Sequence, residues 1–232
     1  MNIGFGGYGL YLLFSLPALL LGFWAQIKVK GAIQKYSRIR TITGYSGSDI
    51  ARRMLDSNGL REVKIEETRG FLSDHYDPRS KTLRLSPENF RGNSVAAAGI
   101  AAHEAGHALQ HQEEYFPLKI RTAMVPSVQI GSWLGPIVFI GGMLLNWVDL
   151  AWVGVFLFGA TAIFALVTLP VEFNASNRAK AWLSTSGMIY QDENKGVKSV
   201  LDAAALTYVA GAIQAISTLL YYVFLLSGSR RR

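Results

Sequence analysis

The hydrophobic positions of this 232-residue chain fall into four long apolar runs. The runs cover residues 7–27, about 124–147, about 150–169 and about 203–226. A helix needs about 20 apolar residues to cross a bilayer core of roughly 30 Å, so each run is long enough. No Lys or Arg precedes the first run, which argues for a retained span and against a signal peptide. We therefore predict four transmembrane helices, the second and third forming a hairpin.

Two polar segments, residues 28–120 and 170–202, separate these runs. In the first, a helix is predicted from a cap at Ser46 to Gly59. A second helix of about 18 residues is predicted within 95–114, after the capping pair Asn93-Ser94 and before Pro117. Alternating positions at 63–67 and 82–86 predict strands of a small antiparallel sheet within residues 62–86. Pro170 suits the first turn of a helix that fills the second segment. The expected fold class is a mainly α integral membrane protein.

The charge pattern predicts which side of the membrane each segment occupies. Of 23 basic residues, 16 lie in the first polar segment counted through Arg121, and four lie in the second. The positive-inside rule then puts both segments in the cytoplasm and both termini outside, although residues 230–232 are arginines and oppose the rule. The net charge of +7 calls for no nucleic acid, because five basic residues follow the first span and would meet the lipid bilayer: Lys28, Lys30, Lys35, Arg38 and Arg40.

The candidate chemistry lies in the sequence His103-Glu104-Ala-Gly-His107. On a helix, residues four apart share a face, so both imidazoles can bind one metal ion while Glu104 lies beside a metal-bound water. The chain has no cysteine, which excludes a thiolate site and a thiol nucleophile. We predict one Zn²⁺ per chain, held by histidine and carboxylate ligands.

A catalytic zinc ion needs a third protein ligand, for which His75, His111 or an acidic residue are candidates. His111 lies about 12 Å along the helix axis from His103, whereas zinc bonds are about 2 Å long, so one straight helix cannot supply all three. We expect His111 near the site or at the surface. Glu172 is favoured, because it begins the segment that leaves the third span at the membrane face of the histidine pair.

The motifs together resemble the YugP-type membrane zinc metallopeptidases, and more distantly the HtpX group of gluzincin proteases. The resemblance covers nearly the whole chain, from the first apolar run through SGSDIARRML, LSDHYDPRSKTLRLSPE, AAHEAGHALQHQ and LPVEFNASNRA. The resemblance implies a zincin-like region at 28–120 and a helix at 170–202 that carries the third zinc ligand. It also implies that the ligands are His103, His107 and Glu172 and that Glu104 is the general base. The distant relatives have Asp where this chain has Ser176, which could orient a zinc-bound histidine more weakly.

These motifs suggest an endopeptidase at the cytoplasmic face of a bacterial inner membrane, acting on peptides or membrane proteins. In this hypothesis Glu104 takes a proton from a zinc-activated water and returns it to the leaving amine. An extended substrate would pair with the edge of strand 82–86. The chain also permits a homo-oligomer, and the alternative function is a catalytically silent zinc-binding scaffold. Donors for the tetrahedral intermediate could be His75, Tyr76, Tyr190 or Arg178.

Overall fold

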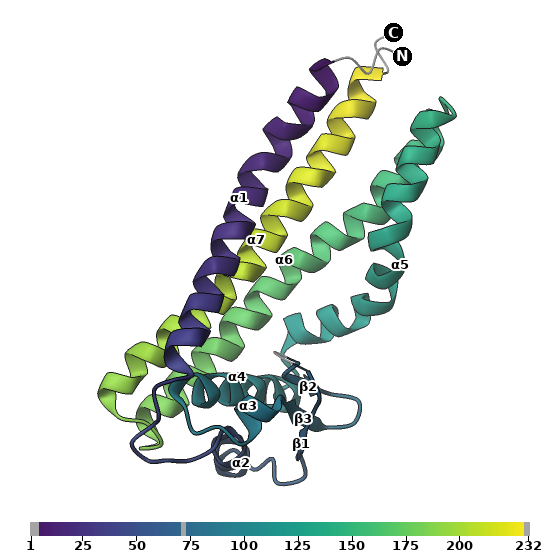
Figure 1. The fold of residues 1–232 in the computed structure, drawn as a ribbon. Coiled ribbons are helices and arrows are strands. Elements are labelled where there is room, and N and C mark those ends of the chain that lie inside the picture. Colours follow the sequence, from purple (N-terminus) through teal and green to yellow (C-terminus); the bar gives the residue numbers. More distant parts are fainter. Residues whose placement is uncertain (1–4, 71–72, 230–232) are drawn as a thin grey trace. The chain divides into compact units, whose positions relative to one another are not determined.

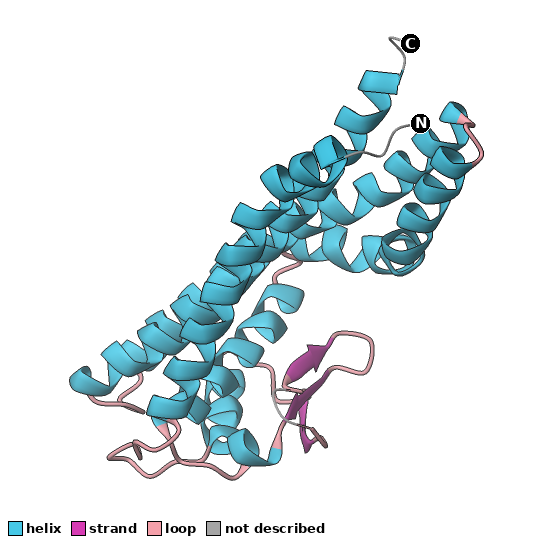
Figure 2. Ribbon diagram, turned by 45° about the horizontal axis from the view of Figure 1, so that its top comes forward, coloured by secondary structure: helices cyan, strands magenta, loops and turns pink. Residues whose placement is uncertain are grey.

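A computed structural model describes residues 5–70 and 73–229, which are mainly helical (Figure 1). The helices of this part of the chain are α1 (Phe5–Tyr36), α2 (Gly47–Ser57), α3 (Pro87–Phe90), α4 (Val95–Gln112), α5 (Phe116–Leu144), α6 (Val148–Thr185) and α7 (Gln191–Ser229). Three short strands are β1 (Lys64–Glu67), β2 (His75–Asp77) and β3 (Thr82–Leu85). Figure 2 shows the same dominance of helices over one small sheet.

Four of the helices, α1, α5, α6 and α7, are long and apolar enough to cross a membrane. The predicted number of spans and the mainly α fold are therefore confirmed. The helices continue beyond the predicted apolar runs, and α6 passes through Pro170 without a break, so the expectation that a new helix begins there is wrong. Pro170 removes one backbone donor, but the φ that its ring imposes is helical, and the turns on both sides of it remain intact.

The chain divides into two compact units, of which the first comprises residues 1–25, 120–169 and 207–232. Here α5 and α6 approach closely at glycines: a Cβ on Gly135 would lie 2.8 Å from the backbone nitrogen of Phe158. Phe14 of α1 packs against Tyr221 and Phe224 of α7. Large apolar side chains remain exposed on the outside of this unit, among them Phe156, Leu144, Leu13 and Phe23. Small residues at helix contacts and apolar residues facing outward are typical of helices that pack in lipid.

The second unit comprises residues 26–119 and 170–206 and has its core around α4. Helix α4 is buried on almost every side, because seven of its residues are alanine and neighbouring elements approach closely. Ser94 caps it by accepting a hydrogen bond from the backbone of Ala97, as the sequence predicts. Helix α2 packs beside α4 and begins with a reciprocal capping box between Ser46 and Asp49. Gly59, with φ of +79°, follows its end.

The sheet of the second unit has the order β1-β3-β2. Strand β2 is antiparallel to β3, but β1 is parallel to β3, so the sheet is mixed and not wholly antiparallel as predicted. Residues 75–77, which lie between the two predicted strands, form β2 and pair with β3. Strand β3 therefore lies in the centre with both edges occupied. The prediction that residues 82–86 offer a free edge to a substrate is wrong, and β1 and β2 are the edge strands.

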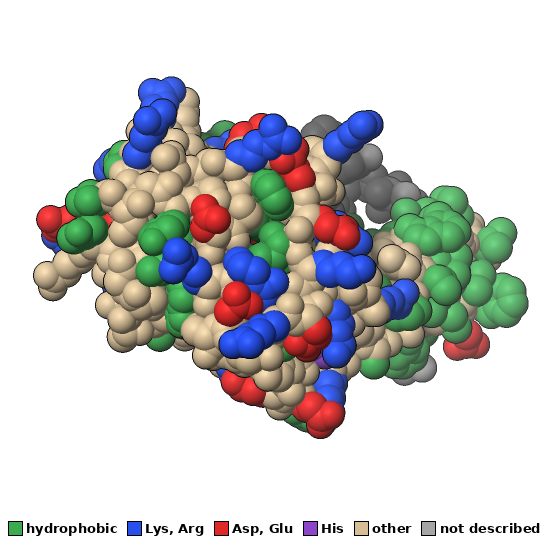
Figure 3. Space-filling view, turned by 90° about the horizontal axis from the view of Figure 1, so that it is seen from below, with side chains coloured by type: hydrophobic (Ala, Val, Ile, Leu, Met, Phe, Trp, Pro, Cys, Tyr) green, Lys and Arg blue, Asp and Glu red, His purple; other side chains and the backbone are tan. Residues whose placement is uncertain are grey.

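The surface of the molecule seen in Figure 3 carries basic and acidic side chains in close alternation. Among the described residues, Arg91 forms an ion pair with Glu67, and Arg84 with Glu66. Such exposed pairs each contribute only about 0–1 kcal/mol to stability. The alternation of charge therefore indicates a surface in contact with water, not one that stabilises the fold.

Candidate metal centre

Two helices of the second unit bring the candidate metal ligands together. Helix α4 supplies His103 and His107, one turn apart, and α6 supplies Glu172. The Oε2 atom of Glu172 lies 3.2 Å from Nε2 of His103 and 3.7 Å from Nε2 of His107. The ligand atoms of all three residues lie within 4.8 Å of one another. The structure thus places three donors around one point, although they are up to 69 positions apart in sequence, counting from 103 to 172.

This donor set fits a zinc ion. Zinc bonds to imidazole nitrogen and carboxylate oxygen are about 2.0–2.2 Å, so donors at tetrahedral corners are about 3.4 Å apart. The separations of 3.2 and 3.7 Å agree with that spacing. The Nδ1 atoms of both histidines are engaged elsewhere, with Oγ of Ser176 at 3.0 Å for His103 and Oε1 of Gln110 at 2.9 Å for His107. Each Nε2 atom is therefore directed at the common point.

Glu172 is 2% exposed, so water screens its interactions with the neighbouring charged groups only weakly. Burial alone lowers the pKa of His107, but the hydrogen bond with Glu172 and the negative charges of Glu104 and Glu172 outweigh it, so the net pKa is raised. A bound divalent cation would compensate these carboxylates in place of the proton. Glu104 is 8% exposed and forms no hydrogen bond or ion pair with any residue that the structure describes. Its carboxylate is therefore available for proton transfer.

A close contact between backbones sets the distance between α4 and α6 at the site. A Cβ on Gly106 would lie 2.8 Å from the carbonyl oxygen of Ala175 and 3.3 Å from its Cα. Gly106 stands between the two histidines in sequence, and Ala175 stands between Glu172 and Ser176. The absence of a side chain at residue 106 therefore lets the carboxylate of Glu172 reach the imidazoles.

Replacing Gly106 with Ala should weaken zinc binding by about 10-fold or more. The added methyl group must push α6 away, and zinc bonds of about 2 Å tolerate little displacement of Glu172. The measurement is the zinc dissociation constant of the purified variant in a competition titration. The control is Gly31→Ala, because a Cβ at Gly31 meets nothing within 4 Å. Gly59→Ala is unsuitable, because the positive φ of Gly59 would itself strain an alanine. Unchanged affinity in Gly106→Ala would contradict this account of the site.

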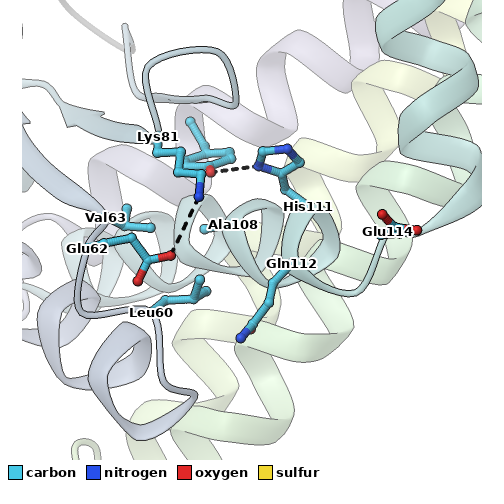
Figure 4. A pocket seen from close by; sticks show the side chains of 9 residues that line it. Leu60, Glu62, Val63, Lys81, Ala108, His111, Gln112 and Glu114 are labelled. Atoms are coloured by element: carbon cyan, nitrogen blue, oxygen red, sulfur yellow. Dashed lines mark hydrogen bonds and ion pairs between the residues drawn. The ribbon is translucent and has the colours of Figure 1, made fainter.

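His111 and Tyr76 lie beside the histidine pair, not in it. Nδ1 of His111 lies 3.0 Å from the Tyr76 hydroxyl, and burial, with the charges of Glu62 and Asp77, raises the pKa of that hydroxyl to about 12. Both side chains line a cavity of about 270 Å³ at the end of α4 (Figure 4). The cavity is also lined by Leu60, Glu62, Val63, Lys81, Ala108, Gln112 and Glu114. Ala108 and His111 follow Glu104 by four and seven residues, so the cavity lies on the Glu104 side of α4.

The other residues suggested for the oxyanion have different surroundings. His75 is exposed on β2, and its Nδ1 lies 2.8 Å from the carbonyl oxygen of Ser73. Tyr190 is 55% exposed before α7. The guanidinium of Arg178 donates to Asn174 through Nε and to both carboxylate oxygens of Glu113 through its other nitrogens. None of the three forms a described contact with His103, His107 or Glu172.

Sequence reasoning missed three residues of this site: Gly106, Gln110 and Asn174. Gln110 follows His107 by three residues, a spacing at which helical side chains meet, so this signal was available. The contact of Gln110 with Asn174 joins two helices and has no local signal. The close approach at Gly106 depends on the backbone of α6, 69 positions away, and likewise has no local signal.

Comparisons with known proteins identify a family and a relative of this chain. A family model described as "putative neutral zinc metallopeptidase" matches residues 11–227. The chain is 47% identical over 221 residues to a Bacillus subtilis (strain 168) protein named "Putative membrane protease YugP". The alignment covers 95% of this chain and 98% of that protein. No solved structure matches the chain.

Proposed function

Because this chain belongs to the neutral zinc metallopeptidase family, we propose that it is a membrane-embedded, zinc-dependent endopeptidase with its site facing the cytoplasm. Its membrane would be the bacterial inner membrane, crossed four times. The four apolar helices support the multi-pass arrangement. The basic residues concentrated in the segments 28–120 and 170–202 support the cytoplasmic position of both segments.

The observation that carries the proposal is the convergence of His103, His107 and Glu172 within 4.8 Å. These residues would hold one Zn²⁺ and leave a fourth position open, as catalytic zinc sites do. When bound, zinc polarises the peptide carbonyl and makes a coordinated water more acidic. Glu104 lies on the same helix, one residue from His103, and forms no hydrogen bond or ion pair among the described residues.

In this proposal Glu104 performs the proton transfers. It accepts a proton from the attacking water as the new carbon–oxygen bond forms, and it gives that proton to the amide nitrogen as the carbon–nitrogen bond breaks. Ser176 and Gln110 hold the two imidazoles through their Nδ1 atoms. The structure supports Ser176 in the role that an aspartate has in the distant relatives, since its hydroxyl lies 3.0 Å from His103.

An extended peptide substrate would pair with β2, the edge strand whose Tyr76 contacts His111 of α4. Backbone hydrogen bonds to an edge strand bind a substrate with little sequence demand. The cavity of Figure 4 lies on the Glu104 side of α4 and offers room for one substrate side chain. Helix α6, which carries Glu172, is itself one of the four apolar helices, and this favours membrane proteins or their fragments as substrates.

Zinc removal tests the proposal. We expect the detergent-purified protein to hold about one zinc per chain and to hydrolyse an unfolded protein substrate. A chelator should abolish hydrolysis, and Zn²⁺ should restore it. Mg²⁺ should not, because it prefers oxygen ligands to imidazole. The measurements are zinc content by mass spectrometry and the rate of peptide release. Hydrolysis that continues at full rate after zinc is removed would refute a zinc-dependent reaction.

A further inference from the structure

Gln110 is completely buried beside the metal centre and uses every polar atom of its side chain. Its Oε1 atom lies 2.9 Å from Nδ1 of His107. Its Nε2 atom donates to the carbonyl oxygen of Val171 at 2.8 Å and to Oδ1 of Asn174 at 2.9 Å. Gln110 therefore joins a histidine on α4 to the turn of α6 that carries Glu172.

The direction of these hydrogen bonds is determined by the partners farthest from the site. The guanidinium of Arg178 can only donate, and its Nε lies 2.7 Å from Asn174, so the atom of Asn174 that faces it must be the oxygen. The same oxygen faces Gln110, and the Val171 carbonyl can only accept. Both contacts require the NH₂ group of Gln110, which leaves its oxygen for His107.

This arrangement determines the tautomer of His107. An amide oxygen can only accept a hydrogen bond, so Nδ1 of His107 must carry the proton. In a neutral imidazole the lone pair is then on Nε2, the atom that faces Glu172 and the candidate metal position. His103 differs, because its partner is the hydroxyl of Ser176, which can donate or accept. Only one of the two histidines therefore has its tautomer imposed by its surroundings.

The outer end of this chain of hydrogen bonds reaches the surface. Arg178 forms two parallel hydrogen bonds with the carboxylate of Glu113, at 2.7 and 2.6 Å, just after the end of α4. This pairing lowers the pKa of Glu113, so both groups are charged at neutral pH. A two-pronged contact between arginine and carboxylate restricts the guanidinium to one orientation. That orientation keeps Nε of Arg178 directed at Asn174.

We propose that Gln110, Asn174 and Arg178 are positioning residues that hold His107 in the tautomer and direction required to bind zinc. They do so from α6, the helix that also carries Glu172, so the same contacts keep the third ligand in register with the histidines. This inference rests on the proposed zinc site and goes beyond it, since it assigns a role to residues that touch neither metal nor substrate.

The test compares the zinc affinity of two Asn174 variants. Asn174→Asp keeps an acceptor oxygen for both Gln110 and Arg178, so its zinc dissociation constant should stay within about threefold of wild type. Asn174→Leu and Gln110→Leu remove the hydrogen bonds and should weaken zinc binding about 10–100-fold, the usual effect of losing a group that orients a metal ligand. The matched control is Gln112→Leu, because Gln112 is exposed on the same helix and donates only to the carbonyl oxygen of Asn58.

Cobalt substitution gives a second readout that a general loss of stability would not change. The visible absorption bands of bound Co²⁺ report the geometry of its ligands, and they should shift in Gln110→Leu and Asn174→Leu but not in Asn174→Asp or Gln112→Leu. If a Leu variant does not fold, Arg178→Gln replaces it, since Arg178 lies near the surface. There we expect a smaller but measurable loss of zinc affinity, about fivefold.

Two results would overturn the proposal. The first is wild-type zinc affinity in Asn174→Leu, or in Arg178→Gln where Asn174→Leu does not fold. The second is an equal loss of zinc affinity in Asn174→Asp and Asn174→Leu. Wild-type protein that binds no zinc would instead refute the proposed metal site. Zinc bound equally by wild type and all variants would refute only the positioning role.

Discussion

Replacing Glu104 with Gln should lower the rate of peptide hydrolysis by about 10²–10⁴-fold, the usual contribution of a general acid–base group. The amide has nearly the same size but cannot accept the proton of the attacking water. Zinc content should remain near one per chain, because His103, His107 and Glu172 are untouched. The rate is measured with a quenched fluorescent peptide, and zinc content with mass spectrometry.

The control for this variant is Glu88→Gln, the same chemical change at an exposed position of α3. It should leave the rate unchanged. A Glu104→Gln variant that hydrolyses peptides as fast as wild type would contradict the assigned role of Glu104. A silent scaffold predicts a different outcome, in which neither wild type nor variant hydrolyses peptides although both bind zinc.

Replacing Glu172 with Ala should remove zinc from the purified protein, with a loss of affinity beyond the roughly 100-fold caused by losing an orienting group. Two imidazoles remain, and no described acidic residue lies with them in the ligand cluster apart from Glu172. The buried position would also lose the charge that balances the cation. Zinc affinity and zinc content are measured as before, and hydrolysis should disappear with the metal.

Asp202→Ala is the control for this substitution, because Asp202 is an exposed acid whose only described ion pair is with Lys180. Zinc binding should be normal in it. Full zinc content in Glu172→Ala would show that the third ligand lies elsewhere. His75 and His111 would then be the next residues to replace, although the structure directs one toward Ser73 and the other toward Tyr76.

The elements that the sequence predicts best are those with a local cause. Capping by Ser46 and Ser94, the end of α2 before Gly59 and the helical spacing of His103 and His107 each depend on residues within one or two turns. The four apolar helices follow from composition over about 20 residues. These features need no knowledge of distant parts of the chain.

The predictions that were wrong concern segments whose local sequence is compatible with two different structures. Pro170 is compatible with the first turn of a helix and, at some cost, with its interior, and only the continuous α6 decides between them. Residues 75–77 are rich in turn-forming neighbours, but pairing with β3 makes them a strand. Because of that pairing β3 is not an edge strand, and β2 lies at an edge of the sheet in its place.

The sequence by itself therefore determined the four apolar helices, the helix that carries His103 and His107, and the types of side chain available as metal ligands. Hydropathy, capping and the types of residue present can all be read without knowing the tertiary contacts. Only the tertiary structure decided which side-chain oxygens lie beside the imidazole nitrogens of His103 and His107. The approach of α6 to α4 at Gly106, the tautomer imposed on His107 through Gln110, and the pairing of Ser176 with His103 depend on contacts between residues more than 60 positions apart. Such contacts form when helices pack, and packing depends on the shapes of both surfaces at once.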